Sequence, residues 1–320
     1  MASTLLPFLL IFPLVFVTST VADVRAGNGT KQVPVVMWHG MGLLIFDFLN
    51  QFIFQGDCCC NPLSMGSVKK LIEQEVPGVY VHSLELGGSI TKDIEHGFFA
   101  NVNELVYMAC IKIKNDPELA NGYNAIGFSQ GAQFLRAVAQ RCPHPPMKNF
   151  VSIGGQQQGV FGAPYCIGDN VMCNSVRRLI DMGAYLPFVQ KRVVQAQYWH
   201  DPNQPDEYKK RSIFLADINN ENKNNPTYKR NLLNLKNILL VKFNQDHMVV
   251  PKESSWFGFY KDGDIDTILP MNETDLYLED RIGLRKLHES GRLQFLAVDG
   301  DHLQIPRDVL VNEIIKKYFM

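Results

Sequence analysis

Strand and helix patterns alternate over the first half of the chain. Short apolar runs, typical of buried strands, occur at residues 33–38, 79–84, 122–128 and 149–153. Apolar residues at helical spacing lie between them, over residues 62–76, 98–114 and 130–141. Parallel strands need crossover helices, and these cover both faces of the sheet. The alternation therefore predicts an α/β fold with a mostly parallel sheet flanked by helices.

The pattern changes between about residues 156 and 236, where the chain is polar, helical and irregular. Strand patterns return at residues 237–243 and 293–298, and an amphipathic segment, residues 309–318, ends the chain. An insertion between sheet strands is a natural place for a lid or a substrate-binding subdomain. We therefore expect a single domain over residues 23–320, with an inserted subdomain over about 156–236.

The N-terminus has the pattern of an export signal. Residues 5–17 form an apolar run that is too short to cross a bilayer, and small residues follow it at 20–22. We expect residues 1–22 to be a cleaved signal peptide, with an uncleaved anchor or a buried apolar segment as the alternatives. Two glycosylation sequons, at Asn28 and Asn272, agree weakly with export.

Composition and cysteine spacing exclude some classes of function. The net charge of -1 gives no basic excess for global binding of nucleic acid. The seven cysteines lack the spacing of zinc ligands, so we expect no metal site. In an oxidising compartment six of them could form three disulfides, with one cysteine left over.

The most specific motif is a GxSxG sequence, Gly127-Phe128-Ser129-Gln130-Gly131, between a predicted strand and a predicted helix. The serine of such a motif occupies a sharp, strained turn, and the glycines let strand and helix pass close to it. The helix N-terminus then directs free N–H groups at developing negative charge. A bare GxSxG recurs in unrelated proteins, but this context predicts the α/β-hydrolase fold with Ser129 as its nucleophile.

An oxyanion hole needs a second donor, usually from the loop after an earlier strand. Residues 39–42, with the sequence HGMG, follow the first predicted strand and resemble the HGGG type of loop. We predict that the backbone N–H groups of Met41 and Gln130 are the donors. Because such a loop acts through its backbone, the side chain of His39 is more simply interpreted as a packed core histidine.

Chain order selects the base, since the histidine comes last in this fold. His247, His288 and His302 lie after the last block of strands begins. His302 directly follows the strand pattern at 293–298, in a loop that would carry it to the carboxyl edge of the sheet. His302 is therefore the predicted general base.

The acid is expected between the serine and the histidine. Asp246 follows the strand pattern at 237–243 by three residues, which is the expected position. Asp217 is the competitor, but it falls inside the irregular insertion. In the predicted triad His302 takes the proton of Ser129, and Asp246 fixes the tautomer of His302. This chemistry needs no metal or organic cofactor.

Long segments of the chain resemble a known family. They carry its tryptophans, glycines and cysteines, and lie at residues 38–42, 59–66, 122–142, 154–162, 195–202, 212–219, 256–260 and 300–304. Through them the chain, from about Pro34 onward, resembles the lysosomal palmitoyl-protein thioesterases of the α/β-hydrolase superfamily. By that resemblance Ser129, Asp246 and His302 fall on the catalytic triad of the family.

The resemblance also implies a substrate class and a location. It implies hydrolysis of palmitoyl thioesters on S-acylated cysteines of proteins and peptides undergoing degradation, in a lysosomal and secreted enzyme without a stable membrane span. A glycan-dependent sorting receptor would then be a further partner. The acyl groove of the family is formed largely by the insertion. Apolar candidates for it, each of which could equally be core, are Val160, Phe161, Leu186, Val193 and Trp199.

Disulfide pairs likewise follow from the resemblance. It pairs Cys110 with Cys142, Cys166 with Cys173, and the adjacent Cys59 with Cys60. Cys58 is the odd residue, either a free thiol or a substitute for one partner of the adjacent pair.

One segment departs from the family. The family runs almost directly from the HGMG loop into the cysteine pair, whereas this chain interposes Leu43–Gln55, which is strongly apolar with one charge. It could be a hydrophobic lid, a membrane-touching loop, a splice variant or translated intron. In each case it could displace Met41 or block the acyl entrance. Two alternatives to a thioesterase remain. A general lipase or carboxylesterase would use the same triad, and a silent lipid-binding protein would result if this segment disabled the site.

Overall fold

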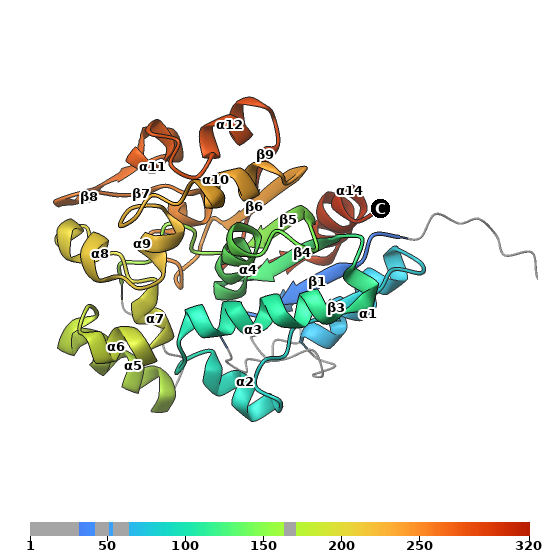
Figure 1. The fold of residues 1–320 in the computed structure, drawn as a ribbon, viewed down its shortest axis with the longest axis horizontal. Helices are drawn as coiled ribbons and strands as arrows, with labels where there is room; N and C mark the ends of the chain where they lie inside the picture. Colours follow the sequence, from blue (N-terminus) through green and yellow to red (C-terminus); the bar gives the residue numbers. More distant parts are fainter. Residues whose placement is uncertain (1–31, 42–50, 54–63, 163–170) are drawn as a thin grey trace, which may run out of the picture. The chain divides into compact units, whose positions relative to one another are not determined.

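The computed structural model describes residues 32–41, 51–53, 64–162 and 171–320 (Figure 1). Several predictions fall outside these residues. They concern the signal peptide over 1–22, the sequon at Asn28, Cys58, the Cys59–Cys60 pair, Cys166, and the segment Leu43–Gln55 apart from residues 51–53.

A six-stranded parallel sheet forms the core of the described chain, in the order β3-β1-β4-β5-β6-β9. Its strands are β1 (Val35–Trp38), β3 (Val81–Ser83), β4 (Tyr123–Phe128), β5 (Met147–Ile153), β6 (Asn237–Phe243) and β9 (Leu293–Val298). Every residue of β1 and β4 is buried, because these strands are covered on both faces. The predicted fold class, a mostly parallel sheet flanked by helices, is confirmed.

Alternate residues of β1 divide the core between the two faces of the sheet. Val36 and Trp38 join a cluster with α3 (Val102–Asn115) and α4 (Gln130–Arg141). Val35 and Met37 join a second cluster with α1 (Met65–Glu75) and the C-terminal segment. The C-terminal segment comprises β10 (Gln304–Pro306), α13 (Arg307–Val309), η4 (Leu310–Ile315) and α14 (Lys316–Tyr318). This period of two is what a strand imposes on its side chains.

Among the described residues between β5 and β6, the chain forms six helices before it returns to the sheet. They are α5 (Val171–Gly183), α6 (Pro187–Arg192), α7 (Val194–Gln197), α8 (Pro205–Arg211), α9 (Leu215–Ile218) and α10 (Pro226–Leu233). Proline occupies the first turn of α6, α8 and α10, where its missing N–H has no intrahelical acceptor in any case. Residues of α5, α6 and α7 form a third, smaller apolar cluster with Phe98.

Short elements complete the described chain. Between β6 and β9 lie η2 (Lys252–Trp256), the antiparallel hairpin of β7 (Phe259–Lys261) and β8 (Asp264–Leu269), η3 (Met271–Glu273), α11 (Asp275–Leu278) and α12 (Leu284–Glu289). Earlier in the chain lie α2 (Ile90–His96) and η1 (Pro117–Leu119). The hairpin was not predicted, because β8 lies largely in solvent and so lacks an apolar run.

Two links join distant parts of the described chain. Cys110 of α3 and Cys142 at the end of α4 form a disulfide with a Cα–Cα distance of 6.0 Å, which confirms that pair. Cys173 is also disulfide-bonded, and its predicted partner lies outside the described residues. Within the segment that departs from the family, β2 (Gln51–Ile53) pairs antiparallel with β10, just after His302.

Candidate active site

Ser129 occupies a strained turn between β4 and α4. Its φ of 52° and ψ of -127° are unusual for a residue with a side chain, and its N–H donates to the carbonyl of Ile153 at 2.8 Å. A Cβ atom on Gly131 would lie 2.2 Å from the carbonyl oxygen of His39, so only glycine lets the helix approach the HGMG loop here. The serine side chain makes no capping bond to its own helix and is directed elsewhere.

His302 joins Ser129 to Asp246. The distance from His302 Nε2 to Ser129 Oγ is 2.9 Å, and that from His302 Nδ1 to Asp246 Oδ2 is 2.7 Å. A carboxylate only accepts, so Nδ1 carries the proton and Nε2 is left to accept from the serine hydroxyl. The three predicted triad residues therefore lie in one hydrogen-bonded chain, although 173 positions separate the serine from the histidine.

The carboxylate of Asp246 is fixed from two sides. Its Oδ1 accepts the backbone N–H groups of Met248 and Val249, both at 2.9 Å, while Oδ2 faces His302. The side chain has no exposed surface. Fixed in this way, the carboxylate can hold the imidazole in a single orientation and tautomer.

The rival candidates have other partners. Asp217 forms an ion pair with Arg141 at 2.7 Å and accepts from the hydroxyl of Tyr228 at 2.9 Å. His247 is exposed and lies 3.2 Å from Asp301. His288 hydrogen-bonds Tyr277 at 2.9 Å. None of the three bonds to Ser129 or His302.

The HGMG loop is anchored through the side chain of His39, which is buried. Its Nδ1 lies 2.7 Å from the carbonyl oxygen of Gly40, and its Nε2 lies 2.7 Å from Asp93 Oδ2. Burial disfavours ionisation of Asp93, but the hydrogen bond from His39 and those from two backbone N–H groups lower the pKa of this carboxyl below its ordinary value. Both ring nitrogens of His39 therefore lie within hydrogen-bond distance of an oxygen atom, which fixes the orientation of the ring.

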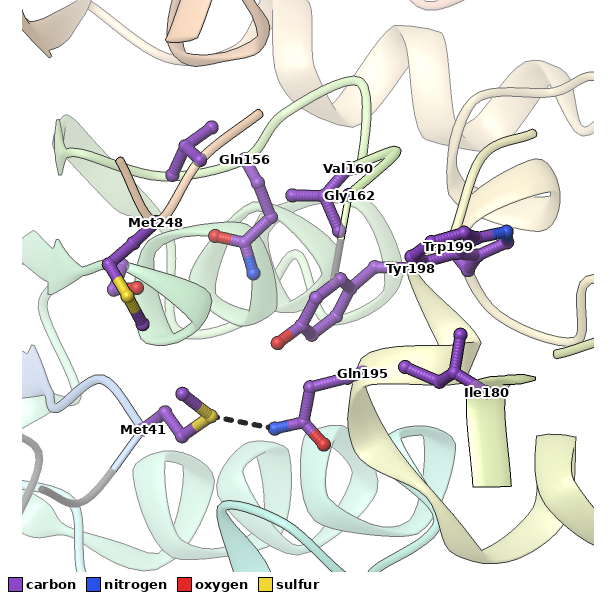
Figure 2. Close-up of a pocket in the computed structure, with 11 residues that line it drawn as sticks. Met41, Gln156, Val160, Gly162, Ile180, Gln195, Tyr198, Trp199 and Met248 are labelled. Atoms are coloured by element: carbon purple, nitrogen blue, oxygen red, sulfur yellow. Dashed lines mark hydrogen bonds between the residues drawn. The ribbon is translucent and has the colours of Figure 1, made fainter. Parts of the chain in front are cut away.

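Gln195 and Tyr198 contact the two predicted oxyanion donors from the insertion side. Gln195 Nε2 lies 2.9 Å from the Met41 sulfur, the contact that Figure 2 marks, and also donates to the carbonyl of Gly97 at 3.0 Å. The Tyr198 hydroxyl donates to Gln130 Oε1 at 3.2 Å. Burial raises the pKa of Tyr198, so its hydroxyl stays protonated. Neither contact could be predicted from the sequence, because no local motif ties residues 195–198 to positions 41 and 130.

A largely apolar pocket opens beside Ser129 (Figure 2). Its lining comprises Met41, Gln156, Val160, Gly162, Ile180, Gln195, Tyr198, Trp199, Met248 and Val249. Of the predicted groove residues, it includes Val160 and Trp199. Phe161 packs on Trp199 with ring centroids 5.4 Å apart, whereas Leu186 lines a neighbouring cavity and Val193 is buried in the third cluster. Among the described residues, no three His, Cys, Asp or Glu side chains gather in a way that could hold a metal ion.

Comparison with known proteins gives several matches. The sequence model of the palmitoyl protein thioesterase family matches residues 34–302. The chain is 81% identical over 309 residues to palmitoyl-protein thioesterase 1 of Caenorhabditis elegans, which covers 97% of this chain and 99% of that protein. It is 38% identical over 257 residues to palmitoyl-protein thioesterase 3 of Dictyostelium discoideum, which covers 80% of this chain and 84% of that protein.

Solved structures resemble the chain more distantly, and a type II thioesterase is one example. The type II thioesterase BorB from the borrelidin biosynthetic cluster is 12% identical, with 89% of this chain and 91% of that chain covered and a TM-score of 0.45. The family assignment therefore rests on the sequence matches, which span nearly the whole chain. This chain belongs to the palmitoyl protein thioesterase family.

Proposed function

We propose that the chain hydrolyses thioesters between long-chain fatty acids, palmitate above all, and cysteine residues of proteins or peptides. Ser129 is the nucleophile, His302 the general base and Asp246 the residue that orients the base. The observation that carries the proposal is the hydrogen-bonded chain of these three residues beside an apolar pocket, in a member of the palmitoyl protein thioesterase family.

Acylation begins when His302 Nε2 removes the proton from Ser129 Oγ as that oxygen attacks the thioester carbon. Negative charge moves to the carbonyl oxygen, and Asp246 stabilises the imidazolium that forms. The C–S bond then breaks, the acyl group stays on Ser129, and the cysteine thiol leaves with the proton of His302. A thiol has an ordinary pKa of about 8.5 and so departs with little acid assistance.

Deacylation repeats these steps with water. Water attacks the acyl carbon and gives a proton to His302, which returns it to Ser129 Oγ as the fatty acid departs. In both steps the backbone N–H groups of Met41 and Gln130 stabilise the oxyanion. Because α4 begins at Gln130, its N-terminal dipole adds to this stabilisation.

The thioester end of the acyl chain lies in the pocket beside Ser129, whose volume of about 30 Å³ admits only the first atoms of that chain. Val160, Ile180 and Trp199 give it an apolar wall, and Met248, two residues after Asp246, also lines it. Because Val160, Ile180 and Trp199 all lie between residues 156 and 236, the insertion acts as the substrate-binding subdomain. Apolar burial of the chain then supplies most of the ground-state affinity.

We also propose entry into the secretory pathway through the signal peptide of residues 1–22, with delivery to the lysosome and secretion. Asn272 is exposed in η3, so its sequon is accessible for glycosylation, and a glycan-dependent sorting receptor is the partner that this route implies. Relatives in Mus musculus and Rattus norvegicus are named lysosomal thioesterases. Among the described residues, no helix is both long and apolar enough to span a bilayer.

Turnover of a palmitoylated peptide tests the chemistry directly. Hydrolysis should be readily measured for the wild-type chain, and Ser129→Ala should lower kcat on the order of 10⁵-fold or more. A fluorophosphonate probe should label Ser129 in the wild-type chain and fail to label this variant. Appreciable turnover by folded Ser129→Ala would rule out Ser129 as the nucleophile.

The two alternatives give different outcomes in the same assay. A general lipase would hydrolyse the oxygen ester of the same acyl chain as fast as the thioester. A silent lipid-binding protein would neither turn over the thioester nor take the label, although it would be folded. Removal of Leu43–Gln55 tests whether this segment is what silences the protein, since recovery of turnover would identify the segment as inhibitory.

A further inference from the structure

The helix–turn–helix of α5 and α6 exposes large apolar side chains. Val171, Met182, Leu186 and Phe188 are 77%, 65%, 39% and 49% exposed. Single exposed apolar residues are ordinary on a protein surface, but four within one short motif indicate a binding surface. We call these residues, with the cations described next, the α5–α6 surface.

Cations surround these apolar residues. Arg177, Arg178, Lys191 and Arg192 are exposed, against one exposed carboxylate, that of Asp181. In the part of the chain that the structure describes, none of the four forms an ion pair. The whole chain has a net charge of only -1, so this local excess of positive charge is a property of the α5–α6 surface and not of the composition.

Helical spacing puts apolar and cationic side chains on common faces. Arg178 and Met182 are four residues apart on α5, and Phe188 and Arg192 are four residues apart across α6. Apolar side chains flanked by lysine or arginine on one surface are typical of segments that lie in the interface of a membrane.

The same turn lines a cavity next to the pocket beside Ser129. This cavity has a volume of about 430 Å³; Met182, Leu186 and Tyr185 form part of its wall, and Asp181, Asp201, Glu207 and Arg211 give the rest a polar lining. Ile180 and Trp199 line both this cavity and the pocket beside Ser129. The α5–α6 surface therefore borders an outer cavity that adjoins the catalytic pocket at Ile180 and Trp199.

We propose that the α5–α6 surface docks on anionic phospholipid bilayers. Met182, Leu186 and Phe188 enter the interface at the level of the headgroups, and the four cations contact lipid phosphates. The outer cavity then faces the bilayer, and the acyl chain of a membrane-bound thioester passes by Trp199 to Ser129. The docking is independent of catalysis, whereas this use of it rests on the proposed thioesterase function.

Charge argues for a bilayer over a second copy of the chain. In a symmetric dimer the same patch meets itself, so the four cations of one copy would face the four of the other. Facing cations repel one another, and only a surface of opposite charge relieves this repulsion. An anionic bilayer supplies both that charge and an apolar layer for Phe188.

Vesicle co-sedimentation of the full-length Ser129→Ala chain tests the docking without turnover. The chain should bind vesicles that contain phosphatidylserine, bind pure phosphatidylcholine vesicles far less, and be released by salt. Phe188→Ser should lower the partition coefficient about tenfold, the effect of withdrawing one large apolar side chain from the interface. Lys191→Gln with Arg192→Gln should lower it on anionic vesicles only.

Matched substitutions elsewhere control for general effects. Ile265→Ser changes an apolar residue of similar exposure, 48%, on β8, and Lys316→Gln with Lys317→Gln removes two adjacent exposed cations at the C-terminus. Both should leave vesicle binding unchanged. The proposal is overturned if Phe188→Ser binds as well as Ile265→Ser, or if anionic lipid has no effect. It is also overturned if sedimentation velocity shows that Phe188→Ser converts a dimer to monomers while vesicle binding persists.

Turnover by the otherwise wild-type chain separates the docking from the proposed function. Phe188→Ser should retain hydrolysis of a water-soluble thioester, which also reports that it folds, and should lose hydrolysis of a palmitoylated peptide anchored in anionic vesicles. Absence of all turnover, with vesicle binding intact, would refute the thioesterase function and leave the docking standing. Equal loss on both substrates would refute delivery from the membrane.

Discussion

At the scale of single residues, the site depends on groups that are held from several sides. Ser129 keeps a positive φ because its N–H is bonded to Ile153 and its neighbour Gly131 abuts the HGMG loop. Such a conformation costs of order 1–3 kcal/mol and persists only when the surroundings over-determine it. The Oγ atom thus faces His302 at 2.9 Å because of its packing, which a motif alone does not specify.

Tyr198 offers a test of the hydrogen bond to Gln130, one of the two proposed oxyanion donors. Tyr198→Phe removes the donor to Gln130 Oε1 and leaves that buried oxygen short of a partner, which costs about 1–3 kcal/mol. If part of this free energy holds the Gln130 N–H in place, kcat should fall about tenfold while KM changes little. Steady-state kinetics on a soluble palmitoyl thioester measure kcat and KM separately.

Tyr123→Phe is the matched control for Tyr198→Phe. The hydroxyl of Tyr123 is buried in β4 and has no hydrogen-bond partner among the described residues, so its removal should leave the kinetics unchanged and raise the free energy of unfolding by about 1–3 kcal/mol. Equal kinetics for both variants would show that Tyr198 does not position the oxyanion hole.

Asp93 gives the HGMG loop, which carries one of the proposed oxyanion donors, a defined pH dependence. Because the pKa of Asp93 is lowered in the folded chain, its charged form contributes stability above the ordinary carboxyl pKa of about 3.9, and this is lost as pH falls through the lower folded-state value. Asp93→Asn should therefore destabilise the chain by about 1.5–3 kcal/mol near neutral pH, because a neutral amide replaces the carboxylate that accepts from His39 and from two backbone N–H groups. Denaturant unfolding should show this difference narrowing toward acid, and a constant difference would contradict it.

At the scale of elements, the helices beside the sheet are joined covalently. The disulfide between α3 and α4 spans 32 positions, so in the chain-entropy model it stabilises the fold by about 3–4 kcal/mol. Cys110→Ser with Cys142→Ser should lower the free energy of unfolding by this amount. Since Cys142 lies at the end of α4 remote from Ser129, kcat per folded molecule should stay unchanged, and a matching drop in kcat would show that the bond also shapes the site.

Some elements followed from the sequence and others did not. The six strands of the sheet were predicted within a few residues, because each is an apolar run buried on one or both faces. The β7–β8 hairpin was missed, because the side chains of β8 lie mostly in solvent and carry no period of two. The small helices α7 and α9 are fixed by tertiary packing, since four residues are too few to be stable alone.

At the scale of the whole described chain, a small apolar cluster of α5, α6, α7 and Phe98 is distinct from the two clusters that pack on the faces of the sheet. Phe98 is fully buried in the third cluster, and its carbonyl accepts the N–H of Val194 at 2.9 Å. Phe98→Ala should weaken that cluster by about 3–5 kcal/mol. Hydrogen exchange should then speed up in α5, α6 and α7 while β4, β5 and β6 stay protected.

Phe150→Ala removes the same side chain from the first cluster and serves as the comparison. Since Phe150 lies in the central strand β5, its loss should speed exchange through the sheet and the insertion together. Activity should suffer in both variants, because Ile180 and Trp199 of the pocket pack on the third cluster. Uniform exchange in Phe98→Ala would show that the insertion does not open separately.

The sequence by itself determined the parallel sheet, the GxSxG turn and the identities of Ser129, His302 and Asp246 as candidates. These features are local: a buried strand is an apolar run, and each candidate follows such a run at the carboxyl edge of the sheet. Only the tertiary structure decided the contacts of Gln195 with Met41 and of Tyr198 with Gln130, the make-up of the pocket, and the apolar, cationic α5–α6 surface. Those depend on how the insertion folds back over the sheet, and that is set by packing between segments far apart in the chain.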